Sequence, residues 1–351
     1  MRIVHVVDSM QVGGAETLVA LLCRLQREQG HDAAVYCLYD IGTVGSTLLA
    51  EGFEVTLRRA HTPYGAFRRN KPDVVHCHNA SAAIISSFPA RVAGVKSVVV
   101  TRHGLVGPPY LLRRELKFAV ASRFCDSVVA VCEEAKRNLL AAPFAARNRI
   151  IRVYNGVSAI NNSGRTVVPK TGFTLLHVGR LSPIKDQESL LRAFALAKCN
   201  IPDLRLWIVG DGPLRSRLQA LARELDVDSV TQFLGEQADV GPFYTAADLF
   251  VMSSLSEGLP MSLLEATAAG LPSIVTNVGG MAEVASLGGA ACVVPVSNYK
   301  ALADAIYQTA ADSCGLTRSR VAARRCYERN FTAERMANNY TQLYQRSFDR
   351  R

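Results

Sequence analysis

The feature that most limits the fold is an alternation of short β-branched segments with segments of helical length, which starts at the first residues. Strands that alternate with helices form parallel sheets covered by helices on both faces. Six strand segments precede residue 154: "RIVHVVD", "AAVYCLY", "FEVTL", "DVVHCH", "SVVVT" and "SVVAV". The sequence therefore predicts an α/β fold.

A polar stretch, residues 155–172, interrupts this alternation and has the composition of a linker. Six further strand segments follow it: "FTLLHVG", "LRLWIVG", "VTQFLG", "ADLFVMS", "PSIVT" and "ACVVPV". Because 351 residues suit two domains better than one core, we expect two Rossmann-like parallel-sheet domains that face each other across a cleft. Their expected bounds are residues 1–163 and 164–331. The final helix, about 332–351, could pack on either domain, and packing back on the first is one of the two alternatives.

The apolar and cysteine content indicates the compartment. No run of about 18 uncharged apolar residues occurs, so no transmembrane helix is expected. The first residues, "MRIVHVVDS", have the pattern of a strand and not of a signal peptide. Nine cysteines without a C-x-x-C pair indicate reduced thiols. We therefore expect a cytoplasmic protein.

The net charge of +10 is concentrated in the first half of the chain. Residues 1–165 hold 21 basic and 12 acidic side chains, giving +9. The basic residues form three clusters: Arg58-Arg59, Arg68-Arg69-Lys71 and Arg113-Arg114-Lys117. The last cluster borders the apolar stretch "LVGPPYLL" (105–112), so we expect reversible docking on an anionic membrane surface. A solvated basic face and a soluble anionic glycan are alternatives. Nucleic acid is not expected, because the clusters lack interleaved aromatic residues.

Polar residues and glycines follow many of the expected strands. In open parallel sheets, ligands bind at the carboxyl ends of the strands, so these positions are candidates for a binding site. They are Gly13, Gly14 and Glu16; His76 and His78; His103; Gly179, Arg180 and Lys185; Gly210 to Pro213; Glu257; and Gly279-Gly280.

Two glutamates stand eight positions apart in "SEGLPMSLLEATAAG" (256–270). Pro260 suits the first position of a helix, and Gly270 followed by Pro272 suits its end. Helical side chains lean toward the N-terminus, so Glu265 should point toward the edge where Glu257 lies. A ligand site is expected there; the alternative is a solvated glutamate.

Arg180 and Lys185 lie five residues apart in one loop, "GRLSPIKD". A guanidinium fork and a lysine point charge together suit a diphosphate, although surface cations are the common alternative. The helix expected to begin at Pro260 would add N–H groups and the positive end of its dipole.

A metal site and several catalytic motifs have weaker support. His76 and His78 would share one face of a strand, but no third ligand follows at zinc spacing. Hydrogen bonding is therefore the expected role, and no metal is predicted. Gly13-Gly14 lacks the third glycine of G-x-G-x-x-G, and neither G-x-S-x-G nor Walker A occurs.

Over nearly its whole length the chain resembles the retaining glycosyltransferases of family GT4, which have the two-domain GT-B fold. The matching segments are "GGAE" (13–16), "TRHG" (101–104), "VAVCEEAK" (129–136), "VYNGV" (153–157), "HVGRLSPIKD" (177–186), "WIVGDGP" (207–213), "FLG" (233–235) and "EGLPMSLLEATAAGLP" (257–272). The last contains the family's E-x7-E element. Asp186 replaces the glycine usual after the lysine, "NGVS" replaces "NGVD", and the stretch after Glu283 is abbreviated.

The resemblance implies transfer of a sugar, with retention of configuration, from a nucleotide sugar to a glycan or lipid-linked acceptor. The setting would be bacterial-type polysaccharide or glycolipid synthesis. A UDP-sugar is the favoured donor and GDP-mannose stays open. No cofactor or divalent metal is expected.

The resemblance also implies roles for individual residues. Arg180 and Lys185 would hold the diphosphate, Glu265 the ribose, and Glu257 the donor sugar. Gly258, Leu259, Pro260 and Met261 would bind the donor, and His103 would contact the donor sugar. Gly13 and Gly14 would close over the diphosphate. Glu16 and His78 would lie on the acceptor side.

Three other functions are compatible with parts of the pattern. A nucleotide-sugar epimerase shares the fold but needs no acceptor. A non-enzymatic two-domain sugar-binding protein usually carries an export signal, which is not expected here. A nicotinamide dehydrogenase would need the missing glycine motif.

Overall fold

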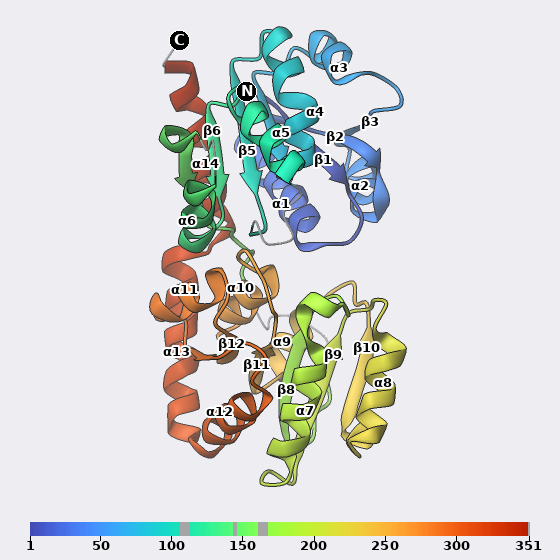
Figure 1. Ribbon diagram of the computed structural model, residues 1–351, viewed down its shortest axis with the longest axis vertical. Helices are drawn as coiled ribbons and strands as arrows, with labels where there is room; N and C mark the ends of the chain where they lie inside the picture. Colours follow the sequence, from blue (N-terminus) through green and yellow to red (C-terminus); the bar gives the residue numbers. More distant parts are fainter. Residues whose placement is uncertain (106–111, 143–145, 161–167, 350–351) are drawn as a thin grey trace. The chain divides into compact units, whose positions relative to one another are not determined.

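The computed structural model describes residues 1–105, 112–142, 146–160 and 168–349 (Figure 1). The chain divides into two compact units, unit 1 (Met1–Gly156 with Ala333–Arg351) and unit 2 (Val157–Thr332). The predicted boundary between residues 163 and 164 lies outside the described residues. The predicted α/β architecture with two parallel sheets is confirmed.

Unit 1 is built on a parallel sheet that, within the described residues, has seven strands in the order β3-β2-β1-β4-β5-β6-β7. They are β1 (Arg2–Ser9), β2 (Asp32–Asp40), β3 (Glu54–Leu57), β4 (Val74–His78), β5 (Ser97–Arg102), β6 (Ser127–Ala130) and β7 (Ile150–Arg152). The sequence analysis did not identify β7, whose three residues pair only with β6. β4 and β5 are fully buried, as expected for central strands of a parallel sheet that helices cover on both faces.

Helices form the crossover connections between the parallel strands of unit 1. They are α1 (Gly14–Glu28), α2 (Gly42–Ala50), α3 (Pro63–Asn70), α4 (Asn79–Val92), α5 (Leu112–Ser122) and α6 (Glu133–Ala141). The strand order reverses between β1 and β4, so the loops after these two strands open a ligand position at their carboxyl ends.

Unit 2 repeats this architecture with a parallel sheet in the order β10-β9-β8-β11-β12-β13. The strands are β8 (Phe173–Val178), β9 (Leu204–Val209), β10 (Thr231–Gly235), β11 (Leu249–Met252), β12 (Ser273–Thr276) and β13 (Ala291–Val294). The helices are α7 (Gln187–Lys198), α8 (Arg215–Glu224), α9 (Gly241–Ala246), α10 (Met261–Ala268), α11 (Gly280–Ser286), α12 (Tyr299–Ala311) and α13 (Ser313–Asn330). Here the strand order reverses between β8 and β11.

The last helix, α14 (Ala333–Asp349), belongs to unit 1, where it packs against α1 and β5 (Figure 1). Its buried face carries two tyrosines. The Tyr340 hydroxyl lies 3.0 Å from Thr101 Oγ1, and the Tyr344 hydroxyl lies 2.8 Å from His76 Nδ1. These buried polar contacts, which local sequence patterns do not reveal, attach the end of the chain to unit 1.

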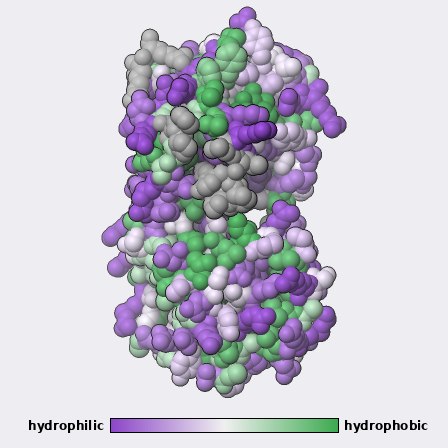
Figure 2. Space-filling model, in the orientation of Figure 1, coloured by the Kyte–Doolittle hydropathy of each residue, from purple (hydrophilic) through white to green (hydrophobic). Residues whose placement is uncertain are grey.

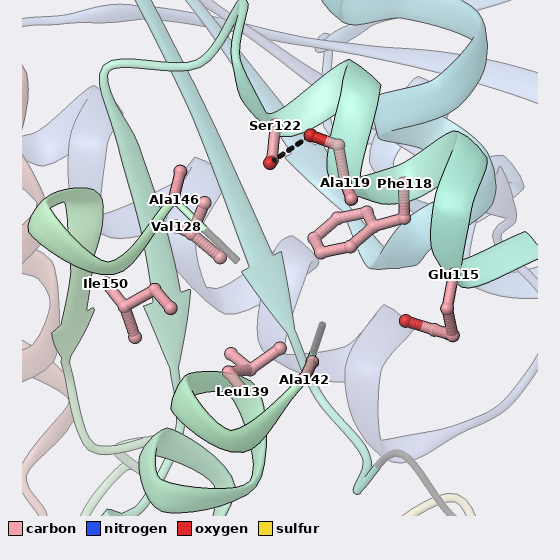
Figure 3. A pocket seen from close by; sticks show the side chains of 9 residues that line it. All are labelled: Glu115, Phe118, Ala119, Ser122, Val128, Leu139, Ala142, Ala146 and Ile150. Atoms are coloured by element: carbon pink, nitrogen blue, oxygen red, sulfur yellow. Dashed lines mark hydrogen bonds between the residues drawn. The ribbon is translucent and has the colours of Figure 1, made fainter. Parts of the chain in front are cut away.

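One pocket in unit 1 lies between α5, α6, β6 and β7 (Figure 3). Its walls are mainly apolar and include Phe118, Val128, Leu139 and Ile150. Its volume is about 20 Å³, enough for roughly one water molecule. It is therefore too small for a sugar.

The sequence analysis predicted no transmembrane helix and reduced cysteines. Among the described residues, no helix combines the length and apolarity needed to cross a bilayer. All nine cysteines fall in the described part of the chain and are free.

Candidate active site

The carboxyl ends of β8 and β11 bring a lysine and a glutamate together in unit 2. Lys185 Nζ donates to Glu257 Oε1 at 2.5 Å, and the side chains are only 19% and 12% exposed. Lys185 ends a short 3-10 turn after β8, and Glu257 lies in the loop after β11. The pair therefore occupies the point where the strand order of this sheet reverses, which is the expected ligand position in such a fold.

Backbone contacts hold the lysine loop and the glutamate loop together. Ser253 Oγ lies 3.1 Å from the Lys185 carbonyl and 2.8 Å from that of Asp186. The Leu255 N–H donates to the Ile184 carbonyl at 2.8 Å. These bonds fix the distance between the two loops, so the ion pair is supported by the backbone on both sides.

Asp186, which stands where the resembled family usually has glycine, has a positive φ of 48°. Aspartate is one of the residues that tolerate this left-handed region. Its carboxylate also accepts from the Ser189 N–H at 3.4 Å and caps α7. Asp186 thus meets the backbone requirement of the glycine it replaces.

The loop that carries Glu257 rests on two glycines after β12. The Gly280 N–H donates to the Gly258 carbonyl at 2.6 Å. Gly279 has φ of 52°, and a Cβ there would overlap the Glu257 carbonyl oxygen. The sequence analysis placed these glycines at a strand end without a role. The structure shows that the close backbone approach requires Gly279 to lack a side chain.

The helix after this loop begins one residue later than predicted. Pro260 is the N-cap with extended ψ of 132°, and Met261 is the first helical residue. Because Pro260 has no N–H, it adds no donor to those offered by its neighbours. Gly258, Leu259 and Pro260 are buried, and Met261 is partly buried.

Glu265 lies in the second turn of α10, where its Oε2 accepts a hydrogen bond from the Tyr244 hydroxyl at 2.9 Å. Burial raises the pKa of this carboxyl, and the hydrogen bond from Tyr244 partly offsets the rise. Tyr244 is fully buried in α9 and was not identified from the sequence. The two glutamates therefore have different partners, Lys185 for Glu257 and Tyr244 for Glu265.

The two predicted cations have different environments, because among the described residues Lys185 is in an ion pair and Arg180 is not. Arg180 is exposed, and within the described part of the chain its side chain makes no ion pair. Its carbonyl accepts from Gln187 Nε2 at 2.9 Å. The same amide lies 3.2 Å from Nε2 of the buried His177, whose Nδ1 donates to the Val251 carbonyl at 3.0 Å. His177 and Gln187 thus hold the backbone of the loop that carries Arg180.

In unit 1, His103 is connected to residues of two neighbouring strands. Its Nε2 lies 3.0 Å from His78 Nδ1, and His78 Nε2 lies 3.0 Å from His5 Nδ1. His5 Nε2 lies 2.8 Å from Gln26 Oε1 in α1. The sequence analysis gave His103 and His78 separate roles and missed His5, a single polar residue in an apolar run, and Gln26, which lies in the charged stretch "CRLQRE".

Three buried histidines of unit 1, His5, His76 and His78, meet the distance requirement for one metal ion. Ligand nitrogens of His5, His76 and His78 lie within 4.8 Å of one another, so His5 is the third ligand that the sequence analysis did not find. Yet both ring nitrogens of each histidine already have hydrogen-bond partners, and those of His76 are Tyr344 and Thr101. A metal would have to displace these bonds.

The glycines after β1 lead directly into α1. Gly13 is the N-cap with extended φ of −173°, and Gly14 is the first helical residue. Glu16, in the first turn, lies beside Gly13. Burial raises the pKa of the Glu16 carboxyl, its own backbone N–H partly offsets this, and Asp8 raises it further. Glu16 and Asp8 therefore form an acidic pair at the carboxyl end of β1.

Two models of glycosyltransferase families match this chain. The model described as Glycosyltransferase Family 4 matches residues 12–159, and that of Glycosyl transferases group 1 matches residues 160–325. Together the two matches span residues 12–325. The chain is a glycosyltransferase. The second match contains Lys185, Glu257 and Glu265, and the first contains His78 and His103.

Relatives of this glycosyltransferase are found among curated bacterial proteins. An Escherichia coli enzyme, UDP-Gal:alpha-D-GlcNAc-diphosphoundecaprenol alpha-1,3-galactosyltransferase, is 29% identical over 62% of this chain and 61% of its own length. The N-acetyl-alpha-D-glucosaminyl L-malate synthase of Bacillus anthracis is 25% identical over 79% of this chain and 75% of its own.

Solved structures share the fold of this glycosyltransferase. Anabaena Alr3699/HepE in complex with UDP superposes with a TM-score of 0.86 at 19% identity, over 98% of this chain and 100% of that one. Its complex with UDP-glucose gives a TM-score of 0.85. The fold of the two units is therefore GT-B.

The buried histidines should make this glycosyltransferase sensitive to acid. Burial lowers the pKa of His5 and of His177 from the ordinary 6.5 to about 4. The unfolded chain gains these protons near pH 6.5 and the folded chain only near pH 4, so stability falls as the pH drops through this window. Each histidine should cost about 2 kcal/mol at pH 5 relative to pH 7.5.

Urea unfolding at the two pH values, compared between the wild type and His177→Gln, measures the effect of one histidine. The variant should lose less stability on acidification, because it cannot gain the proton. An equal loss in both proteins would show that His177 is not held neutral by the fold.

Proposed function

We propose that this chain is a retaining GT4 glycosyltransferase that moves a sugar from a UDP-sugar to a glycan or lipid-linked acceptor. The observation that carries the proposal is the largely buried Lys185–Glu257 pair at the strand-order reversal of unit 2. The relative named as a galactosyltransferase that acts on GlcNAc-diphosphoundecaprenol supports a role in bacterial polysaccharide or glycolipid synthesis.

Lys185 has donors left for the leaving group. An ammonium carries three N–H donors, and Glu257 occupies one of them. The other two can reach diphosphate oxygens, with Arg180 as a second, exposed cation. When the anomeric carbon leaves the diphosphate oxygen for the oxygen of an acceptor hydroxyl, the departing diphosphate oxygen takes the bonding electron pair, and the proton that the hydroxyl loses passes to the diphosphate. Fixed cations stabilise this developing charge.

The two glutamates serve different parts of the donor in this proposal. Glu257 accepts from a hydroxyl of the donor sugar while it holds Lys185 in place. Glu265, positioned by Tyr244, accepts from the ribose hydroxyls. His103 contacts the donor sugar, Gly13 and Gly14 approach the diphosphate, and Glu16 lies toward the acceptor.

The nucleotide can be identified by a thermal-shift panel of UDP-, GDP- and ADP-sugars. A ligand at 100 times its Kd stabilises the folded state by about 2.7 kcal/mol, so UDP-sugars should raise the melting temperature. The complexes of HepE with UDP and UDP-glucose support this choice. A shift with GDP-mannose alone would replace UDP by GDP. Conversion of a UDP-sugar to its epimer without an acceptor would instead indicate an epimerase.

Transfer should survive EDTA. Lys185, Arg180 and the first turn of α10 supply positive potential for the diphosphate, so no divalent ion is needed in this proposal. Activity with and without EDTA should agree within about twofold, a margin that is small against the loss of a charged contact. Loss of activity on chelation, restored by one divalent ion, would assign a metal to the group His5, His76 and His78.

A surface of unit 1 suits an anionic membrane. Four exposed apolar side chains lie on α4 and α5, which pack together: Phe88, Val92, Leu116 and Val120. Arg113 and Lys117 are exposed on α5 beside them. Figure 2 shows hydrophobic and hydrophilic residues next to one another on the face of unit 1 that it displays. Of the stretch 105–112, residues 106–111 lie outside the described residues. We propose that the α4–α5 surface docks on the membrane that carries the acceptor.

Co-sedimentation with vesicles of rising anionic-lipid content tests this docking. Each basic residue near the membrane contributes about 1 kcal/mol, so the double variant Arg113→Gln/Lys117→Gln should bind roughly thirtyfold more weakly. Arg58→Gln/Arg59→Gln removes the same charge from the loop after β3 and should bind nearly as the wild type. Wild-type protein that stays in the supernatant at low salt would favour a soluble acceptor.

A further inference from the structure

Three adjacent strands of unit 1 place three imidazoles in a hydrogen-bonded line. His5 lies on β1, His78 ends β4, and His103 follows β5, and these strands are neighbours in the order β1-β4-β5. The rings are joined by two contacts of 3.0 Å, and Gln26 in α1 closes the inner end at 2.8 Å. Only the outer residue, His103, belongs to the proposed donor site.

The line can carry hydrogen bonds in only one direction at a time. Burial lowers the pKa of His5 and His103 to about 4 and that of His78 well below its ordinary value, so the rings are neutral at pH 7. A neutral imidazole has one N–H donor and one acceptor nitrogen. Each ring that donates toward Gln26 must therefore accept on its other nitrogen.

Gln26 sets this direction. Its Oε1 lies 2.8 Å from His5 Nε2 and can only accept, and the Gln26 side chain lowers the pKa of the Tyr344 hydroxyl, which burial and Tyr340 raise. With the Gln26 oxygen as acceptor, His5 donates from Nε2 and accepts on Nδ1. His78 then donates from Nε2 to His5 and accepts on Nδ1 from His103.

The outer end of the line is an acceptor. His103 donates from Nε2 to His78, so its Nδ1 carries the lone pair, and within the described residues this nitrogen has no hydrogen-bond partner. The His103 backbone is held separately, because its N–H donates to Asn79 Oδ1 at 3.1 Å. The backbone position and the protonation site of His103 are thus fixed by different contacts.

We propose that His78 is a positioning residue: with Gln26 and His5 it holds His103 as the tautomer protonated at Nε2, so that His103 Nδ1 accepts a hydrogen bond from a hydroxyl of the donor sugar. This inference rests on the proposed function, in which His103 contacts the donor. It gives His78 a different role from the acceptor-side position expected from the sequence. It also means that His103 selects a hydroxyl at this point and does not donate a proton to the sugar.

Nitrogen-15 NMR of the histidine-labelled protein without ligand tests the tautomer directly. His103 Nδ1 should have the chemical shift of an unprotonated nitrogen and Nε2 that of a protonated one. In His78→Leu the His103 signals should change to a mixture of tautomers. In His78→Asn they should stay as in the wild type, because the Asn oxygen can accept from His103. A wild-type His103 protonated at Nδ1 overturns the proposal, even if no variant folds.

His76→Asn is the matched control. His76 is fully buried on the same strand, but its hydrogen bonds go to Thr101 and Tyr344. Its replacement should leave the tautomer of His103 unchanged. A change as large as that in His78→Leu would mean that any disturbance of this core alters His103, which contradicts a specific role for His78.

Calorimetry with UDP-glucose and with UDP provides a functional measurement. His78→Leu should weaken binding of UDP-glucose about fivefold, the usual effect of one hydrogen bond, and leave binding of UDP unchanged. His78→Asn should restore most of the loss, and His78→Leu should add no further loss to His103→Ala. Equal weakening for both ligands would indicate a merely structural role and overturn the proposal. If the wild type binds neither ligand, the proposed function fails. The tautomer measurement then still decides whether His78 sets the protonation site of His103.

Discussion

Lys185→Ala and Glu257→Ala should each lower sugar transfer about a hundred- to a thousandfold while the protein keeps its fold. The loss of one charged contact to the departing diphosphate costs roughly 3–4 kcal/mol in the transition state. The two side chains lie 2.5 Å apart and are largely buried, so removing either also leaves the other without its partner. Steady-state kinetics with the donor identified by the thermal-shift panel measures the effect, and circular dichroism checks the fold.

The chain contains a matched control for this experiment. Lys170 pairs with Asp248 at 2.7 Å, and these residues precede β8 and β11, the same two strands that Lys185 and Glu257 follow. Lys170→Ala thus removes a lysine from an ion pair at the opposite ends of those strands. It should leave transfer within about twofold, because a partly exposed pair away from the site contributes little. Near-normal turnover in Lys185→Ala or Glu257→Ala would contradict the site assignment.

Gly279→Ala should reduce transfer by about a hundredfold. The added Cβ would overlap the Glu257 carbonyl oxygen, and the backbone has φ of 52°. The loop would have to move, and with it the Glu257 carboxylate. A misplacement of roughly 1 Å costs about 10² in rate, whereas the strain in the backbone costs about 1–3 kcal/mol of stability. Kinetics and urea unfolding of the same sample separate the two effects.

Gly288→Ala separates the overlap from the backbone strain. Gly288 also has a positive φ, 85°, but nothing lies within 4 Å of the position of its Cβ. Its replacement should cost a similar amount of stability without a comparable loss of transfer. If Gly279→Ala keeps near-normal activity, the contact between Gly279 and the Glu257 loop does not position the carboxylate.

Most strands of the fold could be predicted because their signal is local. The mainly apolar runs of β4, β5 and β8 and the β-branched residues within them indicate buried parallel strands. β7 was missed because its three residues, Ile150–Arg152, are too few to form a pattern. The start of α10 differed by one residue because Pro260 suits both the N-cap and the first helical position.

The candidate site was predictable only as a set of positions. The rule that ligands bind at the carboxyl ends of parallel strands indicated Lys185, Glu257 and His103. Their partners were not indicated, because His5 and Tyr244 lie in mainly apolar stretches and Gln26 lies among the charged residues of α1, where a polar side chain is ordinary. Burial of a polar side chain becomes informative only when its hydrogen-bond partner is known.

By itself, the sequence determined two parallel α/β sheets and the strand-end positions of the candidate residues, since alternation and loop composition act over a few residues. Only the tertiary structure decided which side chains meet. Lys185 and Glu257 are 72 residues apart, and His5 and His78 are 73 apart. Such pairs depend on the order of the strands in each sheet, which is set by the packing of the whole unit. That packing brings β8 beside β11 and β1 beside β4, and so creates the ion pair and the histidine line.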